Sequence, residues 1–399
     1  MVRSGVPWLL AALALRVAFA LKLGGRQHQI DEGAFYNTAL TFAKTGSFGP
    51  GQVIPPVPVF VFAAFLRLFG PSMLWPRLGQ AIIGSGTAWL VGRSTEDLSG
   101  DKRAGLIAFA VAAVYPFFVY YNGMLMSETL DLALLVPGLW LLCRALRDGR
   151  PRDAAGAGLL MGLAALCRAE GAFIMGVVWL AAAALRRDRL KTIAVAAAFW
   201  LLSILPWCAR NRAVTGRFAL DIHGGMTMLH GTELFELNEV DTRVAQTAFY
   251  ETAAYKASAS LPEAERDKLY MKEAVAFMKA NPGQTLSQWV SKFFTFWRLW
   301  PRTDKAYQED AVSHPSAGLP RGALVVISLL FEPALIFGGL CGLWLLRDRL
   351  KYLFPAYLWL LGTMGIHVLS VSQMRYRLPV TPVLMLGMAV TLARRRAAR

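Results

Sequence analysis

The stretch LRRDRLKTIAVAAAFWLLSILPWCAR, Leu185 to Arg210, decides the fold class of this sequence. Its apolar run, 190–208, has close to the length of about 20 residues that a helix needs to cross a bilayer. A basic cluster precedes the run, as is typical of the cytoplasmic end of a membrane span. Similar runs recur at 6–23, 74–93, 102–121, 128–147, 154–168, 170–186, 322–346, 351–370 and 376–393. The sequence therefore predicts an all-α polytopic membrane protein with about ten transmembrane helices.

The composition of the chain agrees with this fold class. Of 399 residues, 55% are hydrophobic and only 17% are charged, whereas a soluble domain has about 25% charged residues. The net charge of +16 could indicate nucleic-acid binding, but the basic residues lie in short clusters between the apolar runs. This is the positive-inside pattern of membrane proteins, so we expect no nucleic-acid partner. The four cysteines lie in or beside apolar runs, and we expect them to be free thiols.

The basic clusters orient the chain consistently if the N-terminus is cytoplasmic. Arg16 interrupts the N-terminal run and no clear small-residue cleavage site follows it, so we interpret that run as a retained first helix. The alternation of spans then requires that 55–70, which opens with prolines, does not cross the bilayer. We expect this segment to be a juxtamembrane helix in the outer interface. Both termini are then cytoplasmic, and the outer face receives 24–73 and 209–321.

Three parts of the chain follow from this topology. They are a transmembrane module, 1–208, that includes the outer loop 24–73; an outer segment, 209–321; and C-terminal transmembrane helices, 322–399.

The outer segment combines a glycine-rich stretch with helical patterns. HGGMTMLHG, 223–231, reads as a loop; its amides could hold an anion, although a plain turn explains it better. Residues 263–280 have helical periodicity, and Pro282 is expected to break that helix. The Trp-rich stretch 285–301 that follows is typical of an amphipathic interfacial helix.

Two adjacent acids follow the first span, in HQIDEGAFYNTAL, His28 to Leu40. Asp31 and Glu32 fit an acidic first helical turn, where carboxylates favour the positive end of the helix dipole. They also fit a general base or a metal ligand, because a carboxylate can accept a proton from an attacking hydroxyl. Neighbours on a helix point about 100° apart, so we expect only one of them to face a cavity.

Glu128 offers the same choice at the outer start of the span 128–147. It fits a residue that complements the helix dipole, and with Asp131 one turn deeper it fits an acidic pair. A buried acidic pair needs a proton, an arginine or a metal. The pair is therefore compatible with a divalent cation or with a shared proton. If a metal binds, Asp31 and Glu128 are its candidate ligands.

Arginines also collect at the outer ends of spans, where the positive-inside rule places few. They are Arg168, Arg210, Arg212, Arg375 and Arg377. An arginine can bind phosphate oxygens with two bonds and stays charged when desolvated, so these residues are candidates for phosphate binding. Snorkelling to lipid headgroups explains each of them singly. His223 and Tyr376 are further candidates, for contact with an acceptor.

Several familiar site motifs are absent from the sequence. It has no P-loop, no GxGxxG opening a helix, no HExxH and no GxSxG. It also has no DxD pair of the kind that holds a metal and a nucleotide sugar. A sugar donor on the outer face is therefore expected to be linked to a lipid.

The order of the motifs resembles the GT-C class of membrane glycosyltransferases, in particular the branch with the protein O-mannosyltransferases and the aminoarabinose transferase of lipid A. The pieces that carry the resemblance are IDEGAFYNTA, PPVPVFVFAAFLRLFG, PRLGQAIIGSGTAWLVGR, AVYPFFVYYNGMLMSETL, GLLMGLAALCRAEG, LPWCARNRAVTGRF, FMKANPGQTLSQWVSKFF and RYRLPVTP. They span roughly 6–393. Each piece is short, and their common order and spacing make the likeness specific.

The resemblance implies a GT-C fold with outer juxtamembrane helices and a small periplasmic insertion. It implies transfer of a sugar from a polyprenyl-phosphate donor, such as undecaprenyl phosphate, to a lipid, glycan or protein acceptor. It also implies a protein of the bacterial inner membrane whose site faces the periplasm. A single displacement at the sugar would invert its anomeric centre.

By this resemblance, Asp31 is the candidate catalytic base, Glu32 its partner and Glu128 the second acid. Arg210 and Arg375, with Arg377 and Arg168, would bind the donor phosphate. The second acid is Glu where several relatives have Asp, which leaves a metal open. The rival interpretation is a transporter or flippase of lipid-linked sugars, for which acids near the bilayer centre and internal repeats are typical.

Overall fold

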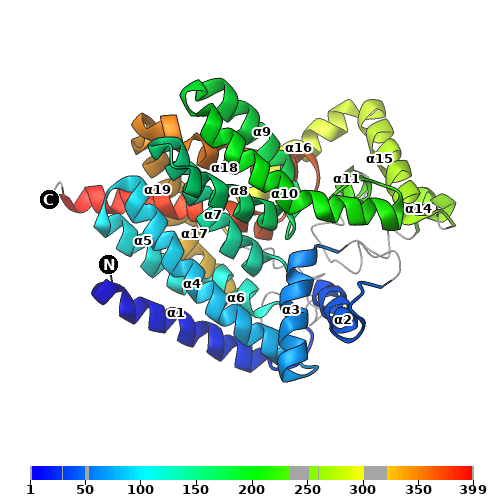
Figure 1. The fold of residues 1–399 in the computed structure, drawn as a ribbon, viewed down its shortest axis with the longest axis horizontal. Coiled ribbons are helices and arrows are strands. Elements are labelled where there is room, and N and C mark those ends of the chain that lie inside the picture. Colours follow the sequence, from blue (N-terminus) through cyan, green and yellow to red (C-terminus); the bar gives the residue numbers. More distant parts are fainter. Residues whose placement is uncertain are drawn as a thin grey trace.

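The computed structural model describes residues 2–28, 30–49, 54–232, 251–258, 260–300 and 321–397, and within these ranges the regular structure is entirely helical (Figure 1). The helices of the transmembrane part are α1 Val2–Leu23, α4 Leu74–Ser99, α5 Lys102–Val114, α6 Pro116–Gly123, α7 Glu128–Asp148, α8 Pro151–Ala165, α9 Glu170–Leu185, α10 Leu190–Thr215, α17 Arg321–Leu345, α18 Leu350–Leu369 and α19 Thr381–Ala397. Six helical segments are long and apolar enough to cross a membrane, or seven if a bent pair counts as one span. The prediction of an all-α polytopic membrane protein is confirmed.

One predicted span is broken. The sequence predicts a continuous helix over 102–121, but α5 and α6 meet at a 48° bend. Tyr115 lies between them in an extended conformation, φ −60° and ψ 119°, because the ring of Pro116 disfavours helical geometry in the residue before it. The proline therefore ends one helix and starts the next.

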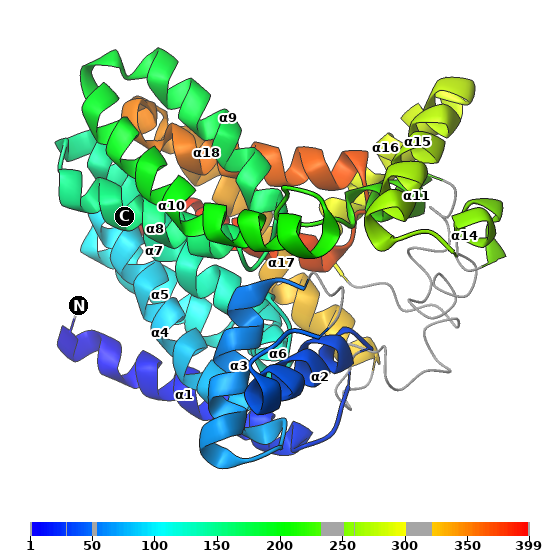
Figure 2. The ribbon, with the colours of Figure 1, turned by 45° about the vertical axis from the view of Figure 1, so that its right-hand side comes forward.

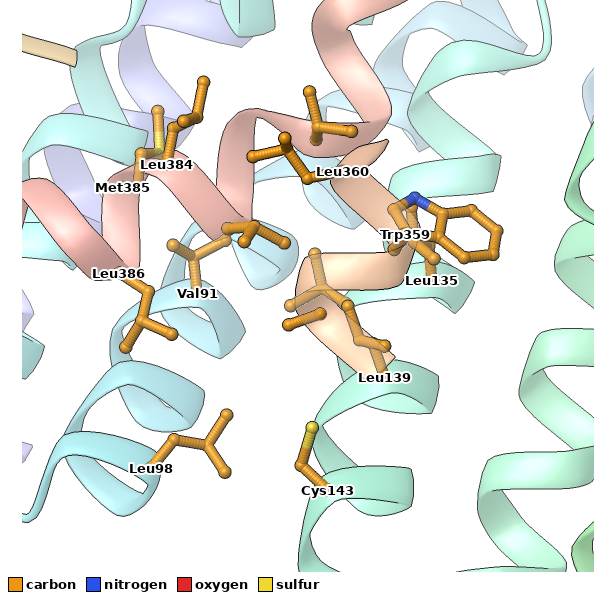
Figure 3. Close-up of a cluster of buried hydrophobic side chains, with 14 of the residues drawn as sticks. Val91, Leu98, Leu135, Leu139, Cys143, Trp359, Leu360, Leu384, Met385 and Leu386 are labelled. Carbon is orange, nitrogen blue, oxygen red and sulfur yellow. The ribbon is translucent and has the colours of Figure 1, made fainter. Parts of the chain in front are cut away.

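Apolar packing between distant helices forms the core of the bundle (Figure 3). The labelled side chains come from α4, α7, α18 and α19: Val91, Leu98, Leu135, Leu139, Cys143, Trp359, Leu360, Leu384, Met385 and Leu386. Small residues let helices approach closely, as is common in membrane bundles: a Cβ on Gly342 of α17 would lie 1.7 Å from the carbonyl oxygen of Gly387 on α19. The outward surface carries exposed Phe173, Leu180 and Trp344, which suits contact with lipid.

Two short helices follow the first span. They are α2 Ile30–Thr45 and α3 Pro56–Phe69, which pack against each other, and α3 also packs on α4. The 14 residues of α3 rise about 21 Å, which is less than the roughly 30 Å of a hydrocarbon core. This length agrees with the expectation that 55–70 does not cross. The two helices place the acids of the first outer loop beside the bundle.

The outer segment contains α11 Gly224–Thr232, α14 Ala253–Ser258, α15 Glu263–Ala280 and α16 Pro282–Phe296. Figures 1 and 2 show α11, α14 and α15 on the side of the bundle away from the two termini. The helix predicted over 263–280 and its end before Pro282 are confirmed. The segment 233–250 and the end of the Trp-rich stretch at residue 301 lie outside the described residues.

The prediction of a loop over 223–231 is wrong, because all of these residues except His223 lie in α11. The glycines serve close packing instead of a turn: a Cβ on Gly225 would lie 1.9 Å from the carbonyl oxygen of Asp267 in α15. The backbone amides of Gly225 and Met226 donate to the Asp267 carboxylate at 2.6 and 3.1 Å. Asp267 therefore caps the first turn of α11, and these two amides already have an anionic partner.

The helix α16 has its polar side turned inward. Gln288 and Lys292 are buried and donate to the carbonyl oxygens of Thr232 and Gly231, at 3.0 and 2.5 Å. Leu286 and Phe294 on the same helix are 61% and 66% exposed. A helix that shows its apolar side outward suits the expected position at the membrane interface.

The pentapeptide RDRLK occurs twice in the chain, at 187–191 and 347–351. Each copy forms a 3₁₀ turn and the start of the following helix: η1 Arg187–Arg189 leads to α10, and η3 Arg347–Arg349 leads to α18. The last arginine of each turn donates to a carbonyl oxygen near the end of another helix. Arg189 reaches Arg147 of α7 at 3.1 Å, and Arg349 reaches Leu98 of α4 at 2.7 Å. The two turns therefore fasten the same end of the bundle in the same way.

Candidate active site

An ion pair between Asp31 and Arg375 lies at the centre of the candidate site. Asp31 is in the first turn of α2, and Arg375 is in η4, Met374–Val380, a 3₁₀ segment that precedes α19. Nη1 of Arg375 donates to Oδ2 of Asp31 at 3.3 Å. The Asp31 side chain is 40% exposed and that of Arg375 is 22% exposed. The carboxylate is thus accessible while its position is held by a charged partner.

Tyr376 packs against several cationic or titratable side chains. Its ring stacks on the ring of His367 at 4.3 Å with 3° between the planes. The guanidinium groups of Arg375 and Arg168 lie 5.0 and 5.6 Å from the centre of the Tyr376 ring, which is cation–π distance. Arg375 also donates to the Tyr376 hydroxyl at 3.2 Å. The tyrosine therefore joins the two arginines into one cluster.

Arg168 connects this cluster to two further acids. It lies in the turn between α8 and α9 and donates to Glu170 at 2.7 Å and to Glu128 at 3.4 Å. His367 of α18 approaches the same Glu170 carboxylate at 3.7 Å. Asp131, one turn into α7 from Glu128, is buried. The turn CRAEG and the start of α7 thus contribute charge to the same place.

The sequence candidates Asp31, Glu128, Arg168, Arg375 and Tyr376 therefore come together from four separate parts of the chain. Glu170 and His367 complete the cluster. His367 was not among the sequence candidates, and the only signal for it is a histidine near the outer end of an otherwise apolar run. We refer to these seven residues as the outer cluster.

Glu32 faces away from the outer cluster into the bundle. Its carboxylate is fully buried and receives a hydrogen bond from Arg77 of α4 at 2.7 Å. The backbone amides of Leu125 and His28 also donate to it, at 2.9 and 2.7 Å. Adjacent positions on α2 thus have different environments, as their angular offset requires. Glu32 ties the start of α2 to α4 and to the link between α6 and α7.

Arg377 is also directed inward, although it is two residues from Arg375. Its Nη2 donates to Glu332 of α17 at 2.5 Å, and its Nη1 donates to the carbonyl oxygens of Phe296 and Arg298. The hydroxyl of Tyr115 donates to the other oxygen of Glu332 at 2.5 Å. Arg377 therefore joins η4 to α16, α17 and the break between α5 and α6.

Arg210 and His223 have surroundings of their own. The guanidinium of Arg210, near the end of α10, lies 5.2 Å from the ring of Phe48 and 4.7 Å from that of Trp207. His223 contacts the carboxylates of Asp221 and Glu263 at 2.6 and 2.9 Å. Burial alone would lower the pKa of His223, but these two hydrogen bonds outweigh it and raise the pKa to about 10. His223 therefore fastens the start of α15 to the end of the α10–α11 link.

The acidic side chains of the candidate site are paired with arginines and are not grouped with one another. The described residues contain no group of three or more His, Cys, Asp and Glu side chains that could hold a metal ion. The two acids that the sequence offers as ligands, Asp31 and Glu128, face Arg375 and Arg168 respectively. Of the cysteines, Cys143, Cys167 and Cys208 are buried and Cys341 is exposed, and all four are free thiols, as expected.

Residues 53–209 match the family model described as dolichyl-phosphate-mannose-protein mannosyltransferase. A search of curated proteins gives no match. Two structures of the oligosaccharyltransferase from Archaeoglobus fulgidus align with the chain. One is the apo form, with a TM-score of 0.54, and the other is AglB in complex with an inhibitory peptide and a dolichol-phosphate, with a TM-score of 0.52. Each is 16% identical and covers 97% of this chain, which spans 50% of that protein's length.

ArnT from Cupriavidus metallidurans, solved with undecaprenyl phosphate, aligns at a TM-score of 0.45 with 13% identity, over 98% of this chain and 78% of that one. The chain therefore has the fold of the archaeal oligosaccharyltransferase, and residues 53–209 carry the sequence pattern of the dolichyl-phosphate-mannose-protein mannosyltransferase family.

Proposed function

We propose that this protein transfers a sugar from a polyprenyl-phosphate carrier to an acceptor hydroxyl at the outer cluster. The observation that carries the proposal is the ion pair of Asp31 with Arg375, which joins a partly exposed carboxylate to a cation suited to phosphate. The family model is named for a dolichyl-phosphate-mannose donor, and AglB, which shares the fold, was solved with a dolichol-phosphate. Both names support a lipid-phosphate carrier.

Arg375 is the proposed ligand of the donor phosphate. Its guanidinium stays charged at any physiological pH and offers two parallel N–H donors to phosphate oxygens. A phosphate that approaches Nη1 competes with Oδ2 of Asp31 for the same N–H group. Binding of the donor would therefore weaken the hold of Arg375 on Asp31 and release the carboxylate for proton transfer.

Asp31 is the proposed general base. As the acceptor oxygen forms a bond to the anomeric carbon, its proton passes to the Asp31 carboxylate. The bond between the anomeric carbon and the phosphate oxygen breaks at the same time, and its electron pair leaves with polyprenyl phosphate. Arg375 stabilises the negative charge that develops on this leaving group. One displacement of this kind inverts the anomeric centre.

The other members of the outer cluster are proposed to hold Arg375 in place. Tyr376 contacts both Arg375 and Arg168, and Glu128 and Glu170 hold Arg168. A catalytic cation needs this support because a misplacement of 1 Å can cost a large part of the rate. In this proposal Glu128, the second acid of the site, acts by holding Arg168.

The remaining candidates take secondary roles. Arg210, beside the rings of Phe48 and Trp207 near the end of α10, is proposed to contact the donor from that side. His223 is proposed to position the outer segment over the acceptor. Glu32 and Arg377 have buried partners, and we propose that they position α2 and η4. The acceptor is a hydroxyl of a lipid, glycan or protein.

We also propose the membrane orientation that the charge pattern indicates. The basic clusters lie at or beside helix ends that meet at one end of the bundle. Hydrogen bonds there join Arg189 to Arg147, Arg349 to Leu98 and Arg186 to Lys351. The positive-inside rule assigns that end to the cytoplasm. The termini then lie in the cytoplasm, and the outer cluster faces the periplasm of a bacterial inner membrane.

The test is a transfer assay with the purified full chain in detergent. A synthetic polyprenyl-phosphate sugar is mixed with acceptor lipids, glycans or peptides, and released polyprenyl phosphate is quantified by mass spectrometry. The proposal expects release that requires an acceptor and that is lost in Asp31→Asn. Donor that crosses vesicle membranes without being consumed would indicate a flippase and would overturn the proposal.

A further inference from the structure

A hollow lies at the end of the bundle opposite to the outer cluster. It has a volume of about 500 Å³ and is lined by the turn η1, the start of α10 and the link between α7 and α8. Its lining includes Arg187, Arg189, Leu190, Lys191 and Val195. The helix α7 has 21 residues and rises about 31 Å between the two ends, which is close to the thickness of a hydrocarbon core.

The lining of this hollow has more basic than acidic side chains. Its acid, Asp188, is already engaged by Arg186 at 2.8 Å and by Arg189 at 3.4 Å. Among the described residues, no acidic side chain forms an ion pair with Arg187 or Lys191. Arg187 opens the turn η1 and Lys191 lies in the first turn of α10, where the backbone amides add positive potential. The hollow therefore presents two cations and a helix start to any anion that enters it.

Part of the lining of the hollow is apolar. Leu190 and Val195 line it, and Leu190 is 49% exposed. Leu185, the last residue of α9, is 67% exposed beside the same turn. A ligand with a charged head and an apolar tail suits such a place, since its tail can lie along these side chains in the bilayer.

We propose that this hollow binds the phosphate group of an anionic phospholipid from the leaflet at that end of the bundle. A basic hollow between membrane helices at the end with the basic clusters is where anionic headgroups are recognised. A free phosphate compound offers the same anionic chemistry, but it would leave Leu190 and Val195 without a partner. This site lies outside the outer cluster, so it is independent of the proposed sugar transfer.

The test measures lipid binding to the full chain after removal of copurified lipid in a neutral detergent. Native mass spectrometry counts bound molecules as dioleoyl phosphatidylglycerol is added, with dioleoyl phosphatidylcholine and soluble glycerol 3-phosphate as separate arms. We expect one saturable phosphatidylglycerol site, and Arg187→Ala/Lys191→Ala should weaken it about 30-fold, because each basic side chain near anionic lipid adds about fivefold in affinity.

The second RDRLK turn supplies a matched control. Arg347→Ala/Lys351→Ala removes the same two charges from the same pentapeptide at the same end of the bundle, and it should leave the saturable site intact. Equal losses in both double variants would mean diffuse surface attraction and would overturn the proposal. So would glycerol 3-phosphate binding as tightly as phosphatidylglycerol, or phosphatidylcholine binding equally well.

A variant that keeps every charge distinguishes loss of the site from loss of folding. Val195→Trp enlarges a side chain that lines the hollow and should abolish the saturable site while the melting temperature of the protein is retained. Unchanged phosphatidylglycerol binding in a folded Val195→Trp protein would also overturn the proposal.

Discussion

Arg375 and Asp31 are 344 residues apart in the chain, yet Nη1 of Arg375 donates to Oδ2 of Asp31 at 3.3 Å. The pair joins the first outer helix, α2, to the 3₁₀ segment that precedes the last helix. The site is thus formed by segments from the N-terminal and C-terminal parts of the chain.

Asp31→Asn should reduce the transfer rate by about 10²–10⁴-fold, the usual contribution of a general base. It should not weaken binding of polyprenyl phosphate, because loss of the carboxylate leaves Arg375 free for the phosphate. Single-turnover rates and equilibrium binding separate the two effects. The matched control is Asp348→Asn, a change at an exposed acid in the other end of the bundle. A donor Kd that rises in Asp31→Asn would contradict the competition between carboxylate and phosphate.

Glu32→Gln should affect stability first. It breaks a fully buried pair with Arg77, and removing one partner of such a pair costs about 3–5 kcal/mol. The melting temperature in detergent should fall clearly, whereas that of Asp31→Asn should change little. Adding Arg77→Met should cost less than the sum of the single changes, since the two residues share one interaction. Additive effects would speak against the pair as the cause.

Tyr376 should contribute mainly through its ring. Tyr376→Phe keeps the cation–π contacts with Arg375 and Arg168 and loses one hydrogen bond, so kcat/KM should fall by no more than about tenfold. Tyr376→Leu loses both contacts, each about 0.5–2 kcal/mol, and should lower kcat/KM further. Equal kinetics of the two variants would show that the ring is not needed to hold the arginines.

The glycines of α11 allow a test of its packing. Gly225→Ala places a Cβ 1.9 Å from the carbonyl oxygen of Asp267, and such overpacking costs roughly 1–3 kcal/mol or more. Gly224→Ala is the control, because a Cβ there meets nothing within 4 Å. Limited proteolysis of the outer segment should therefore accelerate in Gly225→Ala alone. Equal protection of both variants would argue against the close packing of α11 on α15.

The histidine at the start of the outer segment predicts a pH dependence. Hydrogen bonds to Asp221 and Glu263 raise the pKa of His223 from 6.5 to about 10. Its stabilising contribution is then complete below about pH 6.5 and is lost as the pH rises toward 10. The attachment of α15 should loosen over this window, and His223→Gln should remove that part of the pH dependence. Hydrogen exchange of α15 amides at several pH values measures it.

Local patterns in the sequence were enough for most of the helices. The apolar runs and their basic flanks predicted the membrane helices, and the periodicity of 263–280 predicted α15 with its bounds. The prediction failed at 223–231, where glycine has two physical uses. Glycine permits turns, and it also permits two helices to approach closely, as Gly225 does against Asp267. Only the neighbouring helix distinguishes the two uses.

Five of the seven residues of the outer cluster were candidates from the sequence, but the sequence did not show that Glu32 and Arg377 lie outside it. Asp31 and Glu32 are neighbours with the same chemistry, and so are Arg375 and Arg377 in their segment. In the structure Asp31 and Arg375 belong to the outer cluster. Glu32 is buried against Arg77, and Arg377 is buried against Glu332. Which side a residue faces depends on how a helix is rotated in the bundle, and short outer helices carry too little periodicity to fix that rotation.

The sequence by itself determined that this protein folds in a lipid bilayer. Long apolar runs and their basic flanks follow from the cost of placing charge in hydrocarbon, and these patterns can be recognised in the sequence alone. The tertiary structure alone decided which charges meet. Ion pairing acts over a few ångströms in space, and Asp31 finds Arg375 only after the bundle has brought the first outer helix beside the last span.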